Sequence, residues 1–309
     1  MMEVYKYGGN ILKEEGNRKK IYSFFKDRIK KGHKIFMVVS AFGREKDCFS
    51  TDNLAKNLEL LDNCDKDKIV TFGEVYSSLI IKNEMLRVDI KVSSPSYDEI
   101  GIMCDNNYQD GNILGVDMSY LKELIDNNDV VIVPGFIAES MEGKIISLGR
   151  NTSDLTALII GDYFKVDKVN IIKEVDGVYK KDPKLEKCDK KINRLSYDEM
   201  ISLIKAGSKM FSLKSIQYAK DKGIVMEVKG FNKEKGTIIS AEESEERILF
   251  VNQNDESVKV VFKGMEVFND IFRDMVSEKI KLEELVICNN IIYMNGDSNA
   301  SKKILEKYL

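Results

Sequence analysis

The sequence predicts an α/β fold in which an open, mostly parallel sheet carries helices on both faces, followed by a small α+β sandwich. Continuous apolar runs over residues 35–39 and 130–133 are typical of strands that a parallel sheet buries on both faces. Segments with apolar residues at helical spacing, such as Ile21, Phe24 and Phe25, lie between such runs. Strands that alternate with helices in this way indicate parallel βαβ units.

The elements can be placed in order along the first 230 residues. Residues 3–7 alternate and then reach Gly8 and Gly9, which predicts a strand that ends in a tight turn. Further strands are expected at 34–40, 88–92, 130–133, 169–172 and 225–228, with a hairpin at 139–148. Helices are expected at 17–31, 69–81, 120–127, 155–164, 196–205 and 214–222, with a loop over 174–191. Ligands of open α/β sheets bind outside the carboxyl ends of the strands, so the residues that follow the strands are the site candidates.

A change of composition follows these elements. Residues 233–247, with Gly236 and then four glutamates over 242–246, are interpreted as a charged linker. Beyond it the pattern predicts strand, strand, helix, strand, strand and helix at 248–251, 258–262, 265–278, 285–288, 291–294 and 300–308. We therefore expect two domains, 1–240 and 247–309. The second has no glycine-rich loop or reactive cluster, which favours a binding or interaction module.

Composition excludes several classes of protein. The 309 residues carry 48 lysines and arginines against 51 acidic residues, which argues against a dedicated nucleic-acid surface. No apolar stretch approaches the roughly 20 residues that span a bilayer, and residues 1–6 lack a signal-peptide core, so we expect a cytoplasmic protein without membrane contact. The five cysteines lie far apart without metal-ligand spacing, and His33 is the single histidine. A histidine-rich zinc site is therefore excluded, and no side-chain metal site is expected.

The most informative segment is the turn Leu-Gly-Arg-Asn-Thr-Ser-Asp-Leu-Thr-Ala at 148–157, which opens a predicted helix. Helix N-termini leave backbone N–H groups unpaired and carry partial positive charge. Arg150 adds a forked cation that matches a carboxylate, and Asp154 adds an anion beside it. This combination suits a zwitterion such as an amino acid. The alternative is a capped helix with Ser153 as its N-cap.

Other candidates follow the strands. Lys6 before Gly8 and Gly9 indicates a phosphate contact, since glycine allows close approach of the backbone; the alternative is a hairpin-like turn with a surface lysine. Ser40, in Ser-Ala-Phe-Gly-Arg after a buried strand, lies where a ligand fits, or in a plain turn. Glu74 at a helix start binds an ammonium or complements the helix dipole.

Two further segments suit a nucleotide. Residues 176–179, Asp-Gly-Val-Tyr, form a turn with an aromatic residue and are followed by Asp182-Pro183. Such pairs make turns routinely, and the aromatic residue at a sheet edge could line a base. Lys209, in Gly-Ser-Lys-Met-Phe, is a second phosphate ligand or a solvated lysine.

Taken together and in this order, these segments resemble the aspartate kinases of the amino acid kinase family, over residues 3 to about 240. The matching pieces are Lys6-Tyr7-Gly8-Gly9, 38–44, Gly73-Glu74, Pro134-Gly135-Phe136, Gly149-Arg150, 153–157, 175–179, Asp182-Pro183, 196–200, Gly207-Ser208-Lys209 and Gly236-Thr237. The resemblance implies the amino acid kinase fold and ATP-dependent phosphorylation of the β-carboxylate of L-aspartate, a step of amino-acid and lysine biosynthesis. It also implies Mg²⁺ bridging the phosphates, and a homodimer or higher homo-oligomer.

By the same resemblance, roles fall on particular residues. Lys6, Lys209 and Asp154 would be catalytic. ATP would be held by Lys6, Gly8, Gly9, Glu174, Asp176, Tyr179, Asp182 and Lys209. L-Aspartate would be held by Ser40, Glu74, Phe136, Arg150, Ser153 and Asp154. Residues 247–309 resemble a single ACT domain, a ligand-sensing sandwich that could also pair between chains.

The chain departs from the family pattern at defined positions. Asn10-Ile11 replaces Thr-Ser, Asn151 and Thr152 replace two glycines, and Lys173-Glu174 replaces Thr-Asp. A second hypothesis is therefore a catalytically weak paralogue that binds nucleotide or amino acid and regulates a partner. A third, an acetylglutamate or uridylate kinase, is disfavoured by the ACT-like tail and the Ser-Asp-Leu-Thr-Ala helix start.

Overall fold

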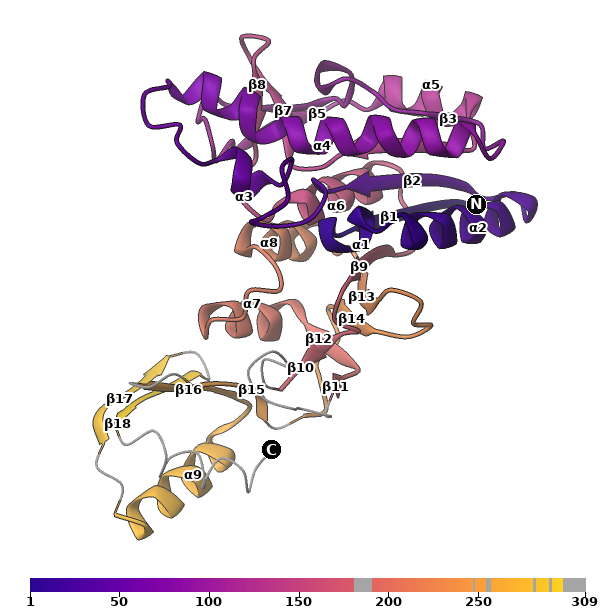
Figure 1. Ribbon diagram of the computed structural model, residues 1–309. Helices are drawn as coiled ribbons and strands as arrows, with labels where there is room; N and C mark the ends of the chain where they lie inside the picture. Colours follow the sequence, from indigo (N-terminus) through magenta and orange to yellow (C-terminus); the bar gives the residue numbers. More distant parts are fainter. Residues whose placement is uncertain (181–190, 247, 254–256, 280–281, 289–290, 297–309) are drawn as a thin grey trace. The chain divides into compact units, whose positions relative to one another are not determined.

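A computed structural model shows two compact units, each described here by itself (Figure 1). The first unit comprises residues 1–176 and 224–234, and the second comprises 177–223 and 235–309. The structure describes all residues except 181–190, 247, 254–256, 280–281, 289–290 and 297–309. In the part of the chain so described, no helix is both long enough and apolar enough to cross a membrane.

A parallel sheet forms the centre of the first unit. Its strands are β1 (Met2–Tyr7), β2 (Lys34–Val39), β3 (Val92–Ser93), β6 (Val130–Pro134), β9 (Val169–Lys173) and β13 (Met226–Gly230). They lie in the order β13-β9-β1-β2-β6-β3, and each described pair is parallel. The predicted parallel sheet is thereby confirmed, and its carboxyl ends share one edge.

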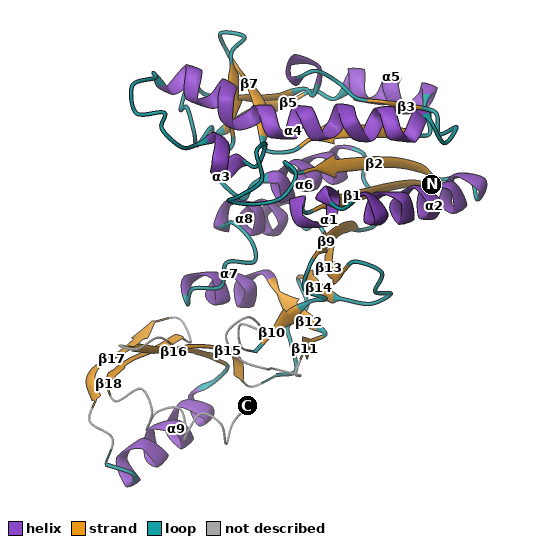
Figure 2. Ribbon diagram, in the orientation of Figure 1, coloured by secondary structure: helices purple, strands orange, loops and turns teal. Residues whose placement is uncertain are grey.

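Helices pack on both faces of this sheet (Figure 2). The helices of the first unit are α1 (Gly9–Lys13), α2 (Glu15–Lys30), α3 (Thr51–Leu54), α4 (Asn63–Leu86), α5 (Ser119–Asn127) and α6 (Ser153–Tyr163), of which the short α3 packs on α4. Tyr5 and Met37 point to one face and join a core with Phe25 of α2 and Met85 of α4. Phe36, the neighbour of Met37, points the other way and meets Phe164 at the end of α6. Successive strand residues thus alternate between two cores.

A smaller sheet, in the order β5-β4-β7-β8, completes the first unit. Its strands are β4 (Ile102–Cys104), β5 (Ile113–Val116), β7 (Ile137–Ser140) and β8 (Ile145–Ser147), and the predicted hairpin at 139–148 corresponds to β7 and β8. Buried Asp67 of α4 ties this sheet to the helix: it accepts hydrogen bonds from the backbone N–H groups of Gln109 and Ser147 and from the Ser147 hydroxyl, at 2.9–3.1 Å. Because Glu74 lies two turns further along α4, this anchor also fixes a candidate site residue.

The second unit contains two groups of elements. Strands β10 (Val178–Tyr179) and β11 (Lys191–Ile192) are antiparallel, β12 (Arg194–Ser196) and β14 (Thr237–Ser240) are parallel, and the helices are α7 (Tyr197–Lys205) and α8 (Leu213–Lys222). The C-terminal group is an antiparallel sheet, β15-β16-β18-β17, with helix α9 (Met265–Ser277). Its strands are β15 (Ile248–Gln253), β16 (Ser257–Phe262), β17 (Leu282–Cys288) and β18 (Ile291–Gly296).

Several expectations need correction. Residues 87–89 form a turn after α4, so the strand expected at 88–92 begins only at Val92. The glycine pair does not end in a simple turn, because Gly9 starts α1. The segment read as a linker contains β14. The helix expected at 300–308 lies outside the described residues, and the proposed boundary between 240 and 247 stays a prediction.

Candidate active site

Two lysines share one carboxylate at the carboxyl edge of the central sheet. Lys6 lies near the end of β1 and Lys173 at the end of the neighbouring strand β9. The Lys6 Nζ lies 2.9 Å from Asp154 Oδ1, and the Lys173 Nζ donates a hydrogen bond to Asp154 Oδ2 at 2.8 Å. Their side chains are 9%, 19% and 3% exposed for Lys6, Lys173 and Asp154, so Lys6 is not the surface lysine of the alternative reading.

The three charges shift one another's protonation. Burial raises the pKa of Asp154, but Lys173 and Lys6 outweigh this effect and hold the pKa below its usual range. Burial lowers the pKa of Lys173, and the neighbouring Lys6 and Arg44 lower it further, against the opposing charge of Asp154. The cluster therefore concentrates positive charge around one ionised carboxylate.

The glycine pair packs against two neighbouring loops. The Gly8 N–H donates to the carbonyl of Ile172 at 3.1 Å, which ties the turn to β9. A Cβ atom on Gly9 would lie 2.0 Å from the carbonyl oxygen of Ala41, and the Gly43 N–H donates to the Gly9 carbonyl at 3.0 Å. Only glycine fits at position 9 in this conformation, because the loops after β1 and β2 pass in direct contact.

A second buried carboxylate lies beside the loop that contains Ser40. Glu74 is 2% exposed, and its Oε1 accepts from the Ala41 N–H at 3.0 Å and from the Thr51 hydroxyl at 3.3 Å. Its Oε2 is buried and has no hydrogen-bond partner among the described residues. Burial raises the pKa of Glu74 to about 8, although these hydrogen bonds and the charge of Lys6 oppose the shift. The free oxygen suits a cationic ligand group.

The turn before α6 places Asp154 but leaves Arg150 outside the buried cluster. Thr152, not Ser153, is the N-cap, and no side chain caps the helix; the Thr152 hydroxyl donates instead to the Gly149 carbonyl at 2.5 Å. The interpretation of Ser153 as the N-cap is therefore wrong. Arg150 has a 73% exposed side chain and forms an ion pair with Asp52 of α3. Asn151 adopts a left-handed φ of +60°, which asparagine tolerates better than most residues.

The loop after β6 lies against the start of α6. A Cβ atom on Gly135 would lie 2.5 Å from the Cβ of Ser153, so the backbone passes directly beside that serine. Phe136 is 5% exposed, and its N–H donates to the Thr156 hydroxyl at 2.9 Å. The first unit thus brings together the predicted residues Lys6, Gly8, Gly9, Ser40, Glu74, Phe136, Ser153 and Asp154, from the ends of β1, β2 and β6 and from α4 and α6.

The predicted nucleotide residues divide between the units. Glu174 and Asp176 follow β9 in the first unit, where Glu174 is exposed. Tyr179 in β10 and exposed Lys209 between α7 and α8 belong to the second unit. Asp182 lies outside the described residues. The convergence of site residues thus concerns the first unit alone, and the roles of these five residues stay predictions.

Sequence reasoning missed three residues that the structure places at the site. Thr51 and Asp52 start the short helix α3 and contact Glu74 and Arg150, respectively. Lys173 was noted as a departure from the family pattern, but no role was predicted for it. Its position at the end of a buried strand beside β1 was the available signal.

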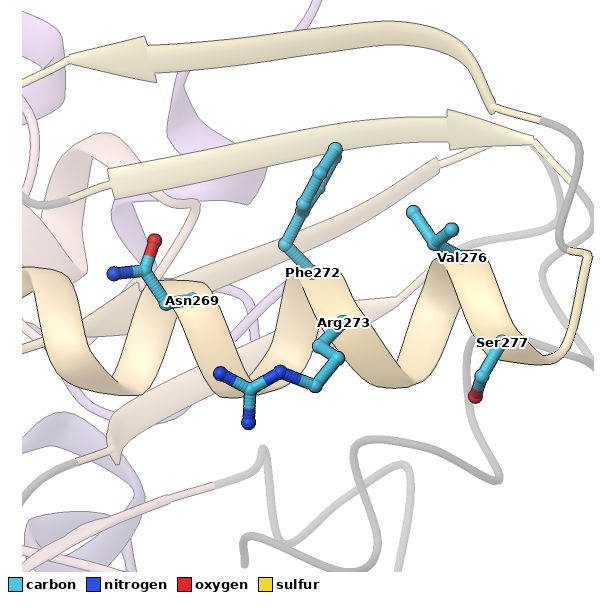
Figure 3. A pocket seen from close by; sticks show the side chains of 5 residues that line it. All are labelled: Asn269, Phe272, Arg273, Val276 and Ser277. Carbon is cyan, nitrogen blue, oxygen red and sulfur yellow. The ribbon is translucent and has the colours of Figure 1, made fainter.

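Two other features of the described residues are separate from this cluster. Asp62, Cys64 and Asp65 at the start of α4 are the one group there with metal-ligand proximity, and exposed acidic groups of this kind are common without a metal. A shallow hollow runs along α9 in the second unit and is lined by Asn269, Phe272, Arg273, Val276 and Ser277 (Figure 3). None of the predicted site residues lines it.

The fold and the cluster define an α/β protein with two buried lysines and a carboxylate at the strand ends of its parallel sheet. Residues 1–230 match the model of the amino acid kinase family. The chain belongs to the amino acid kinase family. The match includes the first unit up to Gly230, where the buried cluster lies, and residues 177–223 of the second unit.

Two curated relatives of this chain are aspartokinases. The chain is 33% identical over 250 residues to an aspartokinase of Helicobacter pylori strain J99, covering 78% of this chain and 60% of that protein. It is 26% identical over 246 residues to aspartokinase 1 of Bacillus subtilis strain 168, covering 78% of this chain and 61% of that protein. The chain therefore spans about three fifths of the length of these relatives.

Solved structures share the fold. The aspartate kinase from Synechocystis superimposes with a TM-score of 0.68 at 20% identity, covering 98% of this chain and 54% of that one. Aspartokinase III of Escherichia coli, in complex with aspartate and ADP, gives a TM-score of 0.67 at 15% identity, covering 100% of this chain and 83% of that one. The predicted amino acid kinase fold is confirmed.

Proposed function

We propose that the protein transfers the γ-phosphoryl group of ATP to the β-carboxylate of L-aspartate, giving 4-phospho-L-aspartate and ADP. The observation that carries this proposal is the buried cluster of Lys6, Lys173 and Asp154 beside the glycine turn. Aspartokinase relatives at 26–33% identity support the choice of acceptor. The chain's other candidate activity, regulation of a partner by a weak paralogue, rests on the substituted positions Asn10, Ile11, Asn151 and Thr152.

The chemistry asks little of the protein beyond position and charge. A carboxylate acceptor is already ionised at neutral pH, so no general base has to remove a proton. One aspartate oxygen bonds to the γ-phosphorus while the bond to the β–γ bridging oxygen breaks, and the bridging oxygen leaves with ADP. Phosphoryl transfer of this kind depends mostly on alignment and charge neutralisation. Lys6, with the Gly9 N–H at the start of α1, would supply those contacts.

The site fits a nucleotide with its magnesium ion. Because position 9 has no side chain, a phosphate can approach the backbone at the start of α1. The two lysines supply positive charge at the same edge of the sheet. Asp154 is already engaged by both lysines, so Mg²⁺ would be held chiefly by the phosphates and water. When bound, the ion neutralises phosphate charge. Lys209, Glu174, Asp176, Tyr179 and Asp182 remain the proposed residues around the rest of the nucleotide.

The amino acid is proposed to lie between Glu74 and the start of α6. Its ammonium would meet the free Oε2 of Glu74, and its α-carboxylate would displace Asp52 from the Arg150 guanidinium, which can bind a carboxylate with two parallel hydrogen bonds. Ser40, Phe136 and Ser153 would complete the contacts. We further propose that the C-terminal sheet and α9 form an ACT-like module, and that the enzyme works in the cytoplasm.

The decisive experiment traps the product. Purified protein is incubated with ATP, Mg²⁺ and L-aspartate, and the acyl phosphate is captured with hydroxylamine as a hydroxamate. We expect hydroxamate with L-aspartate and none with N-acetylglutamate. Uridine monophosphate would give a diphosphate and not an acyl phosphate, so it is tested by ADP release, and we expect none. The variant Lys6→Met should lower turnover by about 10²-fold or more while the fold is retained, because a transition-state charge contact is lost.

The same measurements separate the two candidate functions. Tight binding of nucleotide or aspartate without hydroxamate formation, together with co-purification of another enzyme, would support the regulatory paralogue. Turnover that depends on Lys6 would exclude it. A normal rate in Lys6→Met would instead remove Lys6 from the proposed mechanism.

A further inference from the structure

Lys173 occupies a place that the aspartate kinase pattern gives to threonine. It ends β9, one strand away from Lys6, and the preceding residue, Ile172, accepts the hydrogen bond of the Gly8 N–H. The glycine turn, Lys6 and Lys173 therefore share one corner of the sheet. The resulting contacts belong to this chain and do not follow from the family motif.

Positive charge exceeds negative charge in the described cluster of Lys6, Lys173, Asp154 and Arg44. Lys6 and Lys173 carry two positive charges, and Asp154 carries one negative charge between them. Glu74, which lies within electrostatic reach of Lys6, is largely protonated at neutral pH because burial raises its pKa to about 8. The Arg44 guanidinium adds a further positive charge that acts on Lys173. A largely buried excess of positive charge is costly unless an anion is bound there.

We propose that Lys173 is a further phosphate-binding lysine, which together with Lys6 binds the polyphosphate chain of the nucleotide. Asp154 holds the two ammonium groups at the strand ends while no nucleotide is bound. On nucleotide binding, phosphate oxygens take over part of these contacts. This inference rests on the proposed function, because it assumes that a nucleoside triphosphate is the phosphoryl donor.

A purely structural role would need only one lysine. Lys6 alone neutralises Asp154, and a second ammonium adds the cost of burying another charge. The Lys6 contact also lacks hydrogen-bond geometry at Asp154 Oδ1, whereas Lys173 donates a well-formed bond to Oδ2. Lys173 thus fixes the carboxylate, and Lys6 keeps the looser contact. An ammonium group carries three donors, so a lysine that contacts Asp154 can also donate to a phosphate oxygen.

The test compares nucleotides that differ in phosphate number. Binding of the non-hydrolysable β,γ-imido analogue of ATP, of ADP and of AMP is measured by titration calorimetry with Mg²⁺ and without aspartate. For Lys173→Met we expect about a 10- to 100-fold loss of affinity for the triphosphate, and little change for AMP. Lys173→Arg should recover most of the affinity, because it restores the positive charge. Lys168→Met, at the opposite end of β9 and paired with Glu227, is the matched control and should leave all three affinities unchanged.

Each outcome decides between the roles. An equal loss for all three nucleotides would show a structural role and overturn the proposal, as would unchanged binding in Lys173→Met. Thermal unfolding of each variant shows whether a loss of nucleotide affinity stems from unfolding. If Lys173→Met is unfolded, the affinities of Lys173→Arg decide between the two roles. If the wild type binds the triphosphate analogue but forms no hydroxamate, the proposed acceptor fails while the Lys173 result still stands on its own. A wild type that binds no nucleotide would overturn both proposals.

Discussion

Two buried carboxylates of the first unit are held in opposite protonation states. Asp154 meets two ammonium groups, which hold its pKa below the usual range. Glu74 meets a backbone N–H and a hydroxyl, and its pKa rises to about 8 because these neutral donors do not offset its burial. Pairs of acids whose environments separate their pKa values are typical of active sites.

The raised pKa of Glu74 predicts a pH-dependent stability cost. The folded state binds this proton more tightly than the unfolded state, so the free energy of unfolding falls as the pH rises from about 4.5 to about 8. Glu74→Gln removes the titration. The variant should therefore gain stability relative to the wild type between pH 5 and pH 8.5, by about 1–3 kcal/mol. Denaturant titrations at pH 5 and at pH 8.5 measure the free energy of unfolding of the variant and of the wild type. The same difference between the two proteins at both pH values would contradict the prediction.

Binding of the aspartate ammonium beside Glu74 should also release a proton from the Glu74 carboxyl group to solvent. A bound cation beside Oε2 favours the ionised carboxylate, so aspartate binding at pH 7 is expected to release part of a proton. Calorimetric titration of aspartate in two buffers of different ionisation enthalpy measures the release. It should vanish in Glu74→Gln, and a wild type without buffer dependence would remove Glu74 from the ammonium site.

Substitution of Arg150 is expected to weaken aspartate binding without affecting the fold. Its side chain is 73% exposed and its partner Asp52 lies on a short helix, so the pair contributes little stability. Arg150→Lys keeps the charge but loses the forked geometry, and we expect the aspartate KM to rise about 10-fold with kcat less affected. Steady-state kinetics check this, with Arg87→Lys, exposed at the C-cap of α4, as the control. A higher KM for ATP instead would place Arg150 at the nucleotide.

At the site, the sequence predicted the residues better than their contacts. Lys6, Gly9 and Asp154 are identifiable because they follow strands or open a helix. The ion pair that joins them is not, because it depends on which strands are neighbours: β9 lies beside β1 although more than 150 residues separate them. The same reason hid Lys173, Thr51 and Asp52. Single residues show their chemistry in the sequence, while their partners come from topology.

At the level of elements, the buried strands were predictable and the short connections were not. Runs such as 35–39 have no period that would suit a surface helix, and β2 and β6 formed where expected. The helix α1 was missed because Gly9 normally disfavours helices; here the contact with Ala41 requires glycine at that position. Residues 88–91 alternate between apolar and charged side chains as a strand does, but the backbone N–H groups of 88–90 bond to the last turn of α4.

Asp67 gives a prediction for helix α4. Its carboxylate accepts three hydrogen bonds that join the helix to the small sheet, and Asp67→Asn would turn an amide N–H₂ toward groups that are themselves donors. We expect a loss of about 2–3 kcal/mol in the free energy of unfolding. Asp65→Asn, on the same helix and half exposed, should change it by less than about 0.5 kcal/mol. Urea titration of both variants provides the comparison, and equal effects would show that Asp67 is not an anchor.

At the scale of the whole molecule, the second unit offers surface for association between chains. Its C-terminal sheet has β15 and β17 as outer strands, and unpaired strand edges favour pairing with another copy. Helix α9 adds Met265, Phe272 and Val276, which are 59%, 40% and 61% exposed and follow one face of the helix. Two copies related by a two-fold axis would cover the same apolar face on each other.

We therefore predict a homodimer or a higher homo-oligomer in solution. Light scattering on the eluting protein should give a mass of at least twice that of one chain. Val276→Asp should shift this mass toward the monomer, because a carboxylate in an apolar contact loses its hydration without a partner. Arg273→Ala, on the same helix and 76% exposed, is the matched control and should leave the mass unchanged. A monomeric wild type would contradict the predicted association, and a dimer insensitive to Val276→Asp would place the interface away from α9.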